Sequence, residues 1–420
     1  MNKKSSRTVI ALVMVISLFF LWAISNNLLS SVVKKMMTLF DIDQAKAEFV
    51  ETSYWFAYFL FPIPIAMFMK RYSYKAGIIL GLCIAAVGGL LFFPASMIRE
   101  YWAYLAIFFI IATGMCFLET AANPYVTVLG DPKTASRRLN LAQSFNGLGA
   151  FVAAMFLSKL VLSGNDYTSE TIPADYPGGW DGFVATETAA MRLPYLILAL
   201  VLLTVAVLIW AAKLPKITEG GQEEGEDKDA KLIDFKVLKR SHLRGGVIAQ
   251  FFYNGGQTAL NSMFLIYCCK YVGLAESRAT TFFGLYMLMF LLGRWIGTLL
   301  MGRFKPQNML TVYAVANVLL CVIVAAFGGM VGLYAMLAIS FFMSIMYPTQ
   351  FSLAIEDLGG QTKSGSAFLV MAIVGNVVVP PLTGLIMDHN PGIYHIAYIL
   401  PLICFAVCAW YGWKGHMIKD

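Results

Sequence analysis

The sequence predicts an all-α, polytopic membrane protein whose twelve transmembrane helices form two six-helix bundles. The 420 residues are 59% hydrophobic and only 13% charged, whereas soluble globular domains carry about 25% charged residues. The mean hydropathy is +0.70, and the apolar residues fall in repeated runs of about 20, the length of a membrane-spanning helix. The net charge of +7 does not indicate nucleic-acid binding, because the basic residues lie in short loops between these runs.

Twelve apolar runs are long enough to be transmembrane helices. We place them at residues 8–33, 49–69, 75–95, 100–128, 139–163, 192–214, 244–269, 278–302, 309–329, 331–355, 364–388 and 395–414. Basic residues precede helix 1 and follow helices 2, 4, 8 and 12, so by the positive-inside rule this side is the cytoplasm and holds both termini. The loop 164–190, on the other side, has five acidic residues, among them Glu187, and no Lys or Arg.

A polar linker divides the chain into two parts with six predicted helices each. The stretch EGGQEEGEDKDAK lies in the segment 215–241, which is too polar to form a core and is predicted to be a cytoplasmic linker. Six helices in 1–214 would form the N-terminal bundle and six in 242–420 the C-terminal bundle. An Asn-Pro pair in helix 4 and a Tyr-Pro pair in helix 10 occupy similar places, which favours a parallel internal repeat.

Glu119 is the only charged residue between Tyr101 and Gly130. An acidic residue at the centre of a membrane helix costs about 2.5–3.5 kcal/mol, so a carboxylate there indicates a functional site. The alternative is a structural carboxylate that is neutralised by a proton or by a polar neighbour such as Asn123, one turn further along.

Other polar and aromatic residues occur at membrane depth in both halves. They are Trp22, Asn27 and Ser30 in helix 1, Asn123 in helix 4, Gln143 and Asn146 in helix 5, Tyr253, Gln257 and Asn261 in helix 7, and Asn376 in helix 11. Amides at this depth either join helices or line a wet cavity. A carboxylate with amides on three helices favours the cavity. The set suits a neutral, polyhydroxylated ligand, because amides bind sugar hydroxyls and aromatic rings pack against sugar C–H faces.

The other ionisable residues and motifs do not indicate nucleotide binding or a metal site. Arg294, in LLGRWIG of helix 8, lies about two turns from a basic loop and is interpreted as a gating or snorkelling residue. No GxxxxGK[ST] motif occurs, which argues against ATP-driven transport, and the four histidines have no metal-ligand spacing. We therefore expect no cofactor, no nucleic-acid partner and no enzymatic activity.

Several segments resemble one known family. FFLWAISNNL in helix 1, LETAANPYVTVLG in helix 4, RRLNLAQSFNGLGA in helix 5 and FFMSIMYPTQFSLAI in helix 10 are similar to the fucose–galactose–glucose–proton symporter family of the major facilitator superfamily. The resemblance covers nearly the whole chain apart from 164–190 and 215–241. It implies a bacterial inner membrane protein that works by alternating access around a central sugar site. It also implies that Glu119 takes part in proton coupling and sugar binding. Gln143 and Asn146 match cavity positions of the family, and Asn27 matches the helix-1 asparagine that precedes the family's acidic position.

One position departs from the family pattern. The family's fucose carrier ends its helix-1 string NNLND with an aspartate, whereas this chain reads NNLLS and has Ser30 there. Three alternatives follow: Glu119 alone carries the proton, the coupling ion is Na⁺ held by oxygens of Asn27, Ser30 and Glu119, or the carrier is less tightly coupled. The Na⁺ alternative is chemically reasonable because hard cations take oxygen ligands.

The expected function is secondary active import of a neutral monosaccharide, L-fucose or a related hexose, by cation symport. The expected partners are the sugar, H⁺ or Na⁺ and the lipid bilayer, and we expect a monomer. The alternatives are a Na⁺-coupled glucose, galactose or N-acetylglucosamine transporter, a nucleoside or drug carrier, and a sugar receptor that binds without transport.

Overall fold

The chain forms two compact units. The computed structural model describes residues 11–26, 36, 39–40, 53–153, 167, 171–173, 175–212, 215, 218–219, 222–223, 234–390 and 392–418. Unit 1 comprises Met1–Ala122 and Phe145–Lys216, and unit 2 comprises Asn123–Ser144 and Ile217–Asp420. The division into 1–214, 215–241 and 242–420 stays a prediction.

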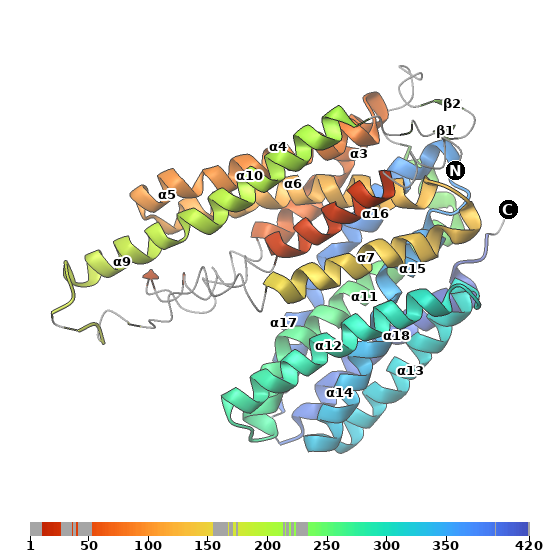
Figure 1. Cartoon of the computed structure of the whole chain (residues 1–420). Helices are drawn as coiled ribbons and strands as arrows, with labels where there is room; N and C mark the ends of the chain where they lie inside the picture. The colour runs from red at the N-terminus through yellow and green to blue at the C-terminus, as the bar shows by residue number, and fades with distance from the viewer. Residues whose placement is uncertain are drawn as a thin grey trace. The chain divides into compact units, whose positions relative to one another are not determined.

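Unit 1 is a set of helices with α4 and α10 side by side (Figure 1). Its described helices are Ala11–Asn26, residues 53–60, α3 (Pro62–Arg71), α4 (Tyr74–Leu90), α5 (Phe92–Ile98), α6 (Tyr101–Val128) as far as Ala122, α7 (Ala135–Val152) from Phe145, α9 (Gly179–Ala190) and α10 (Arg192–Ala211). The rings of Phe92 and Tyr195 stack at a centroid distance of 3.6 Å, which joins α5 to α10. Aromatic packing of this kind adds to the attraction from buried apolar area.

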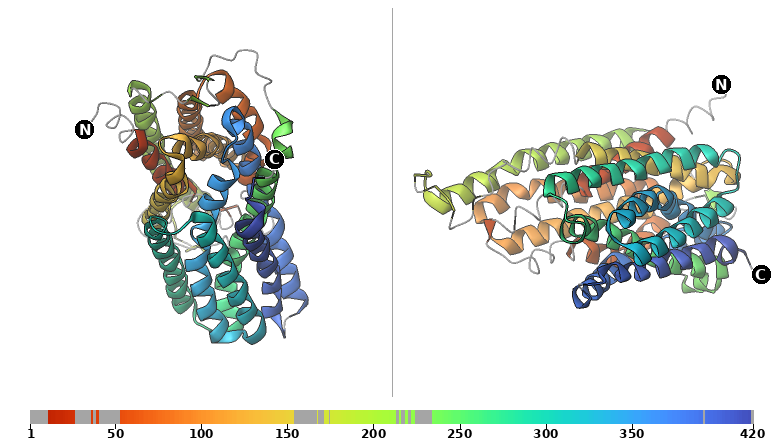
Figure 2. Two further views of the ribbon diagram at one scale, coloured as in Figure 1. Left: turned by 90° about the vertical axis from the view of Figure 1, so that its right-hand side faces the viewer. Right: turned by 90° about the horizontal axis from the view of Figure 1, so that it is seen from below.

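Unit 2 contains the end of α6, the start of α7 and the helices that follow residue 217. These are η1 (Pro132–Thr134), η3 (Phe235–Lys239), α11 (Ser241–Ile266), η4 (Tyr267–Tyr271), α12 (Glu276–Leu300), α13 (Pro306–Phe327), α14 (Gly329–Met343), α15 (Met346–Ala354), η5 (Gly359–Gln361), α16 (Thr362–Met371), η6 (Ala372–Val374), α17 (Gly375–His389), η7 (Tyr394–Tyr398), α18 (Ile399–Trp410) and η8 (Tyr411–Gly415). Helix α11 packs against α17 and α18, and α13 packs against α14 and α18 (Figure 1 and Figure 2).

Each of the twelve predicted spans contains helix in the structure. Within the described part of the chain, eight helices are long and apolar enough to cross a membrane. Helices are expected because a lipid environment offers no hydrogen bonds to the backbone, which must therefore satisfy its own N–H and C=O groups.

The predicted span 331–355 is interrupted one turn before a proline, Pro348. Helix α14 ends at Met343 and α15 begins at Met346. Pro348 has no N–H to donate to the carbonyl of Ser344, four residues earlier, and its ring crowds that carbonyl. The break therefore leaves a buried carbonyl that needs a donor from elsewhere.

Two segments predicted as loop and linker contain regular structure. Within 164–190, α9 forms a continuous span with α10, Gly179–Ala211, and Glu187 is only 3% exposed. Helix α9 contains two acidic residues, but most of its other residues are apolar or alanine. The prediction of a loop considered only the acidic residues and therefore missed this helix. Within 215–241, β1 (Thr218–Glu219) pairs antiparallel with β2 (Gln222–Glu223), a small exception to an otherwise helical fold.

Candidate transport site

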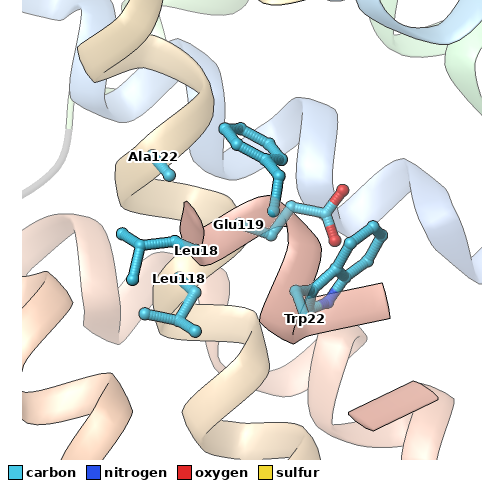
Figure 3. Close-up of a pocket in the computed structure, with 6 residues that line it drawn as sticks. Leu18, Trp22, Leu118, Glu119 and Ala122 are labelled. Atoms are coloured by element: carbon cyan, nitrogen blue, oxygen red, sulfur yellow. The ribbon is translucent and has the colours of Figure 1, made fainter. Parts of the chain in front are cut away.

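Glu119 lies in α6 beside a small apolar cavity in unit 1. The residue is 4% exposed, and the cavity leaves about 10 Å³ open to a water-sized molecule, room for about one water. The other lining residues are Leu18, Phe19, Trp22, Leu118 and Ala122. Figure 3 shows the carboxylate pointing toward the ring of Trp22. An ionised carboxylate in such surroundings needs a proton, a cation or hydrogen-bond donors to offset its lost hydration.

Trp22 is held by hydrogen bonding behind the cavity. Its Nε1 donates to the hydroxyl of Tyr58 at 2.8 Å, and the Tyr58 ring stacks on Tyr54 at 5.7 Å. The Tyr54 hydroxyl donates in turn to Oδ1 of Asn26. Both tyrosines are buried whereas Trp22 is partly exposed, so Trp22 is the aromatic residue of this group that can offer a ring face to a ligand.

Asn146 reaches the backbone of the same cavity wall. Its Nδ2 donates to the carbonyl of Phe19 at 3.2 Å. The close approach depends on Gly149, one turn further along α7, because a Cβ there would lie 2.4 Å from the Phe20 carbonyl oxygen. A glycine thus lets α7 pack closely against the helix Ala11–Asn26. Asn146 therefore contacts Phe19, which lines the same cavity as Glu119.

Gln143 and Asn123 form a buried amide pair in unit 2. Gln143 Nε2 donates to Asn123 Oδ1 at 3.1 Å, and the two residues are 3% and 0% exposed. Asn140 Nδ2 donates to Thr349 Oγ1 at 3.1 Å, one turn before Gln143 on α7. The amides of α7 therefore divide between the units, with Asn140 and Gln143 in unit 2 and Asn146 in unit 1.

Arg294 is buried, so the snorkelling interpretation is wrong, whereas the gating interpretation stays a prediction. It is 4% exposed, its Nε donates to the Ser344 carbonyl at 2.8 Å, and its Nη1 donates to the Gln143 carbonyl at 2.9 Å. The guanidinium also lies 4.5 Å from the ring centre of Phe290, a cation–π distance. Arg294 thus satisfies the carbonyl that Pro348 leaves without a donor and fixes the backbone of Gln143.

Two of the three residues predicted on helix 7 make contacts within the protein. Tyr253 is fully buried, and its hydroxyl donates to the Met343 carbonyl at 3.0 Å. Asn261 Oδ1 accepts a hydrogen bond of 2.9 Å from the Tyr286 hydroxyl. Gln257 is half-buried and has no side-chain hydrogen bond to any other residue that the structure describes. Within the described residues, Gln257 is the one of these three whose side chain is not already engaged in a hydrogen bond.

Asn376 follows the 3₁₀ segment η6 at the start of α17. Its Oδ1 accepts from Thr258 Oγ1 at 2.8 Å, which joins α17 to α11 next to Gln257. A short 3₁₀ segment within a long helix is often a hinge. Asn376 therefore lies at an irregular point of the second unit, and its partner Thr258 follows Gln257 on α11.

Asn27 and Ser30 lie outside the described residues, so the Na⁺ site predicted from them and Glu119 stays a prediction. Among the described residues, no group of three His, Cys, Asp or Glu side chains could hold a metal ion.

Sequence reasoning missed two polar features. Glu187 is a second buried carboxylate of unit 1, and the acidic composition of its segment placed it in a loop. The partners of Arg294 are backbone carbonyls, and a side-chain pattern cannot predict contacts to the backbone. Only the Ser344 carbonyl could have been predicted to need a donor, because Pro348 stands four residues after it.

Apolar helices long enough to cross a membrane, with polar groups buried among them, are typical of polytopic membrane proteins such as transporters. A model of the Major Facilitator Superfamily matches residues 14–377. The chain belongs to this superfamily, and it is a transporter rather than an enzyme.

Relatives and solved structures agree with this assignment. The chain is 38% identical to the L-fucose-proton symporter of Escherichia coli (strain K12), with 96% of this chain and 92% of the relative covered. It is 34% identical to a glucose/galactose transporter of Brucella abortus, with 95% and 92% covered. The crystal structure of the transporter FucP in the outward conformation matches with a TM-score of 0.89 at 38% identity, over 97% of this chain and 99% of that one. The predicted major facilitator fold is thereby confirmed.

Proposed function

We propose that the protein imports a neutral monosaccharide, L-fucose or a related hexose, together with a proton. The observation that carries the proposal is Glu119, a buried carboxylate directed toward the partly exposed ring of Trp22. The 38% identity to an L-fucose-proton symporter over nearly the full chain supports the same substrate class and ion.

In the proposed cycle, Glu119 is protonated when sugar binds from outside. A neutral carboxyl group can donate a hydrogen bond to a sugar hydroxyl, which an ionised one cannot. Trp22 would cover an apolar sugar face, and the family resemblance adds the amides of Asn146 and Gln143. Alternating access then exposes Glu119 to the cytoplasm, where hydration favours loss of the proton.

A second candidate is Na⁺-coupled transport of glucose, galactose or N-acetylglucosamine. Two observations favour it: a relative with 34% identity is a glucose/galactose transporter, and Ser30 stands where the family's fucose carrier has a carboxylate. In this candidate the cation would be held by oxygens of Asn27, Ser30 and Glu119.

Uptake by purified protein in proteoliposomes distinguishes these candidates. Labelled L-fucose is offered under an inward proton gradient alone or an inward Na⁺ gradient alone, with competition by hexoses, amino sugars and nucleosides. Proton-driven accumulation that fucose or hexoses suppress supports the proposal. Accumulation driven by Na⁺ alone favours the second candidate, competition by nucleosides favours a different carrier, and binding without uptake indicates a receptor.

We also infer an inner-membrane location with both termini in the cytoplasm and a monomeric state. The supporting observation for the orientation is the concentration of Lys and Arg in one set of loops. Reporter fusions at the two termini test the orientation, because a reporter that works only outside the cytoplasm should be silent at both.

A further inference from the structure

An apolar groove on unit 2 lies outside the proposed transport site. Its volume is about 360 Å³, within the range of about 300–1,000 Å³ typical of sites for small molecules. Val247, Ile248, Phe251 and Phe252 of α11 form one wall, and Phe368 and Met371 of α16 belong to the other, which η6 completes. The groove residues are apolar without exception, so it fits a hydrocarbon chain and offers nothing to a sugar.

The groove begins where α11 begins, next to a cluster of basic residues. Residues 234–244 contain Lys236, Lys239, Arg240 and Arg244 against one acidic residue, Asp234, and all four basic residues are exposed. Arg244 is three and four residues before Val247 and Ile248, so it lies one turn above them on the same face of α11. The positive charge is therefore placed at the end of the groove, not on a remote surface.

Aromatic packing joins the basic segment to the groove wall. Phe235 of η3 contacts the ring of Phe368 at a centroid distance of 5.7 Å, and yet Phe235 remains 62% exposed. A short segment with an exposed aromatic residue and several Lys and Arg residues is typical of a membrane interface. The composition of segment 235–239 therefore fits the level at which lipid headgroups meet hydrocarbon.

The basic side chains are available to a ligand. In the part of the chain that the structure describes, none of the four is in an ion pair or side-chain hydrogen bond. The nearby carboxylate of Asp234 accepts a hydrogen bond from Gln361 Nε2. Glu356 and Asp357 follow α15, and the Glu356 carbonyl lies 3.0 Å from Nε2 of His242. A negatively charged headgroup would find several unpaired cations here.

We propose that this groove and the basic cluster together bind one anionic phospholipid, with an acyl chain along α11 and α16 and the phosphate at Arg240 and Arg244. Arg is well suited to the phosphate because its planar guanidinium can form two parallel hydrogen bonds. Each basic residue near a negative headgroup strengthens binding by about fivefold. The inference depends on the membrane location and not on the sugar or the coupling ion.

Native mass spectrometry of the full-length protein in detergent tests the site, with phosphatidylglycerol and phosphatidylcholine titrated separately. We expect one retained phosphatidylglycerol of higher affinity and no comparable phosphatidylcholine. The double variant Arg240→Gln, Arg244→Gln should weaken that affinity by roughly 25-fold. Ile248→Trp, at a groove position that is 42% exposed, should weaken it by filling the groove while it leaves every charge in place.

The matched control removes two exposed positive charges elsewhere on unit 2, by Arg303→Gln and Lys305→Gln. This control should retain phosphatidylglycerol as the unmodified protein does. Equal loss in the control and in the Arg240–Arg244 variant would show general charge attraction and overturn the site. Equal retention of the two lipids by the unmodified protein, or normal retention by the Arg240–Arg244 variant, would also overturn it.

Discussion

The two units place buried ionisable groups in opposite settings. In unit 1 the carboxylate of Glu119 borders an apolar cavity with space for about one water. In unit 2 the guanidinium of Arg294 contacts two backbone carbonyls and an aromatic ring. A carboxyl group can exchange a proton, whereas a guanidinium stays charged. The difference suggests that unit 1 supplies the group that titrates and unit 2 supplies a fixed charge that holds the backbone.

The largest expected effect comes from Glu119→Gln. The variant keeps a hydrogen-bond donor and should still bind and exchange sugar, but accumulation against a gradient should fall roughly tenfold or more, within the usual range of coupling between two sites. Uptake and exchange are measured in the same proteoliposomes.

Glu187→Gln is the matched control, because Glu187 is also a buried carboxylate of unit 1, with 3% exposure against 4% for Glu119. It should retain accumulation. If Glu187→Gln lost accumulation as Glu119→Gln does, the claim that Glu119 in particular couples the proton to the sugar would be contradicted.

The next effect concerns Arg294. Arg294→Met leaves the carbonyls of Gln143 and Ser344 without this donor and should lower the free energy of unfolding by about 1–3 kcal/mol. Arg294→Lys retains the charge but lacks the planar fork, so its loss should be smaller. Thermal unfolding in detergent measures both, and Arg303→Met, at an exposed arginine of unit 2, is the control. Equal stability of Arg294→Met and the parent would contradict a scaffold role.

A smaller effect separates the two contributions of Trp22. Trp22→Ala removes the ring face and should weaken sugar binding roughly tenfold, whereas Trp22→Phe keeps a ring, loses the bond to Tyr58 and should weaken binding only about threefold. Binding isotherms for the sugar measure this difference. Trp102→Ala is the control, because Trp102 is 61% exposed. Identical losses in the Ala and Phe variants would show that the ring face does not contact sugar.

The smallest expected effect concerns the pH dependence of the free energy of unfolding. It arises at Glu356, which lies outside the transmembrane spans. Partial desolvation of the carboxyl and the neighbouring Asp357 raise the pKa of Glu356, whose side chain is exposed, while His416 lowers it. The folded chain then binds this proton more tightly than the unfolded chain, so the free energy of unfolding falls as pH rises from the ordinary value through the raised one. Glu356→Gln should remove that fall. Unfolding temperatures from about pH 4 to about pH 7 test it, with the exposed Glu100→Gln as control. A pH dependence that is unchanged in Glu356→Gln would assign the effect to other groups.

The fold could be predicted from sequence because apolar length is a local property, and each predicted span indeed contains helix. Helix α9 could not be predicted in this way, because its two acidic residues led to the prediction of a loop. The placement of Glu119 in a buried span followed from its isolation in an apolar run. The contacts of Arg294 did not follow, because they depend on how α12, α7 and the break before Pro348 meet in three dimensions. Likewise, no periodicity indicated that Asn146 and Gln143 would belong to different units.

Proton movement driven by sugar tests the central claim most directly. Proteoliposomes in weakly buffered, Na⁺-free medium receive sugar, and the external pH is recorded. With Glu119 as the proton carrier, the unmodified protein should make the medium more alkaline in proportion to sugar uptake, and Glu119→Gln should give sugar exchange without a pH change. Sugar-dependent alkalinisation that persists in Glu119→Gln would contradict the account.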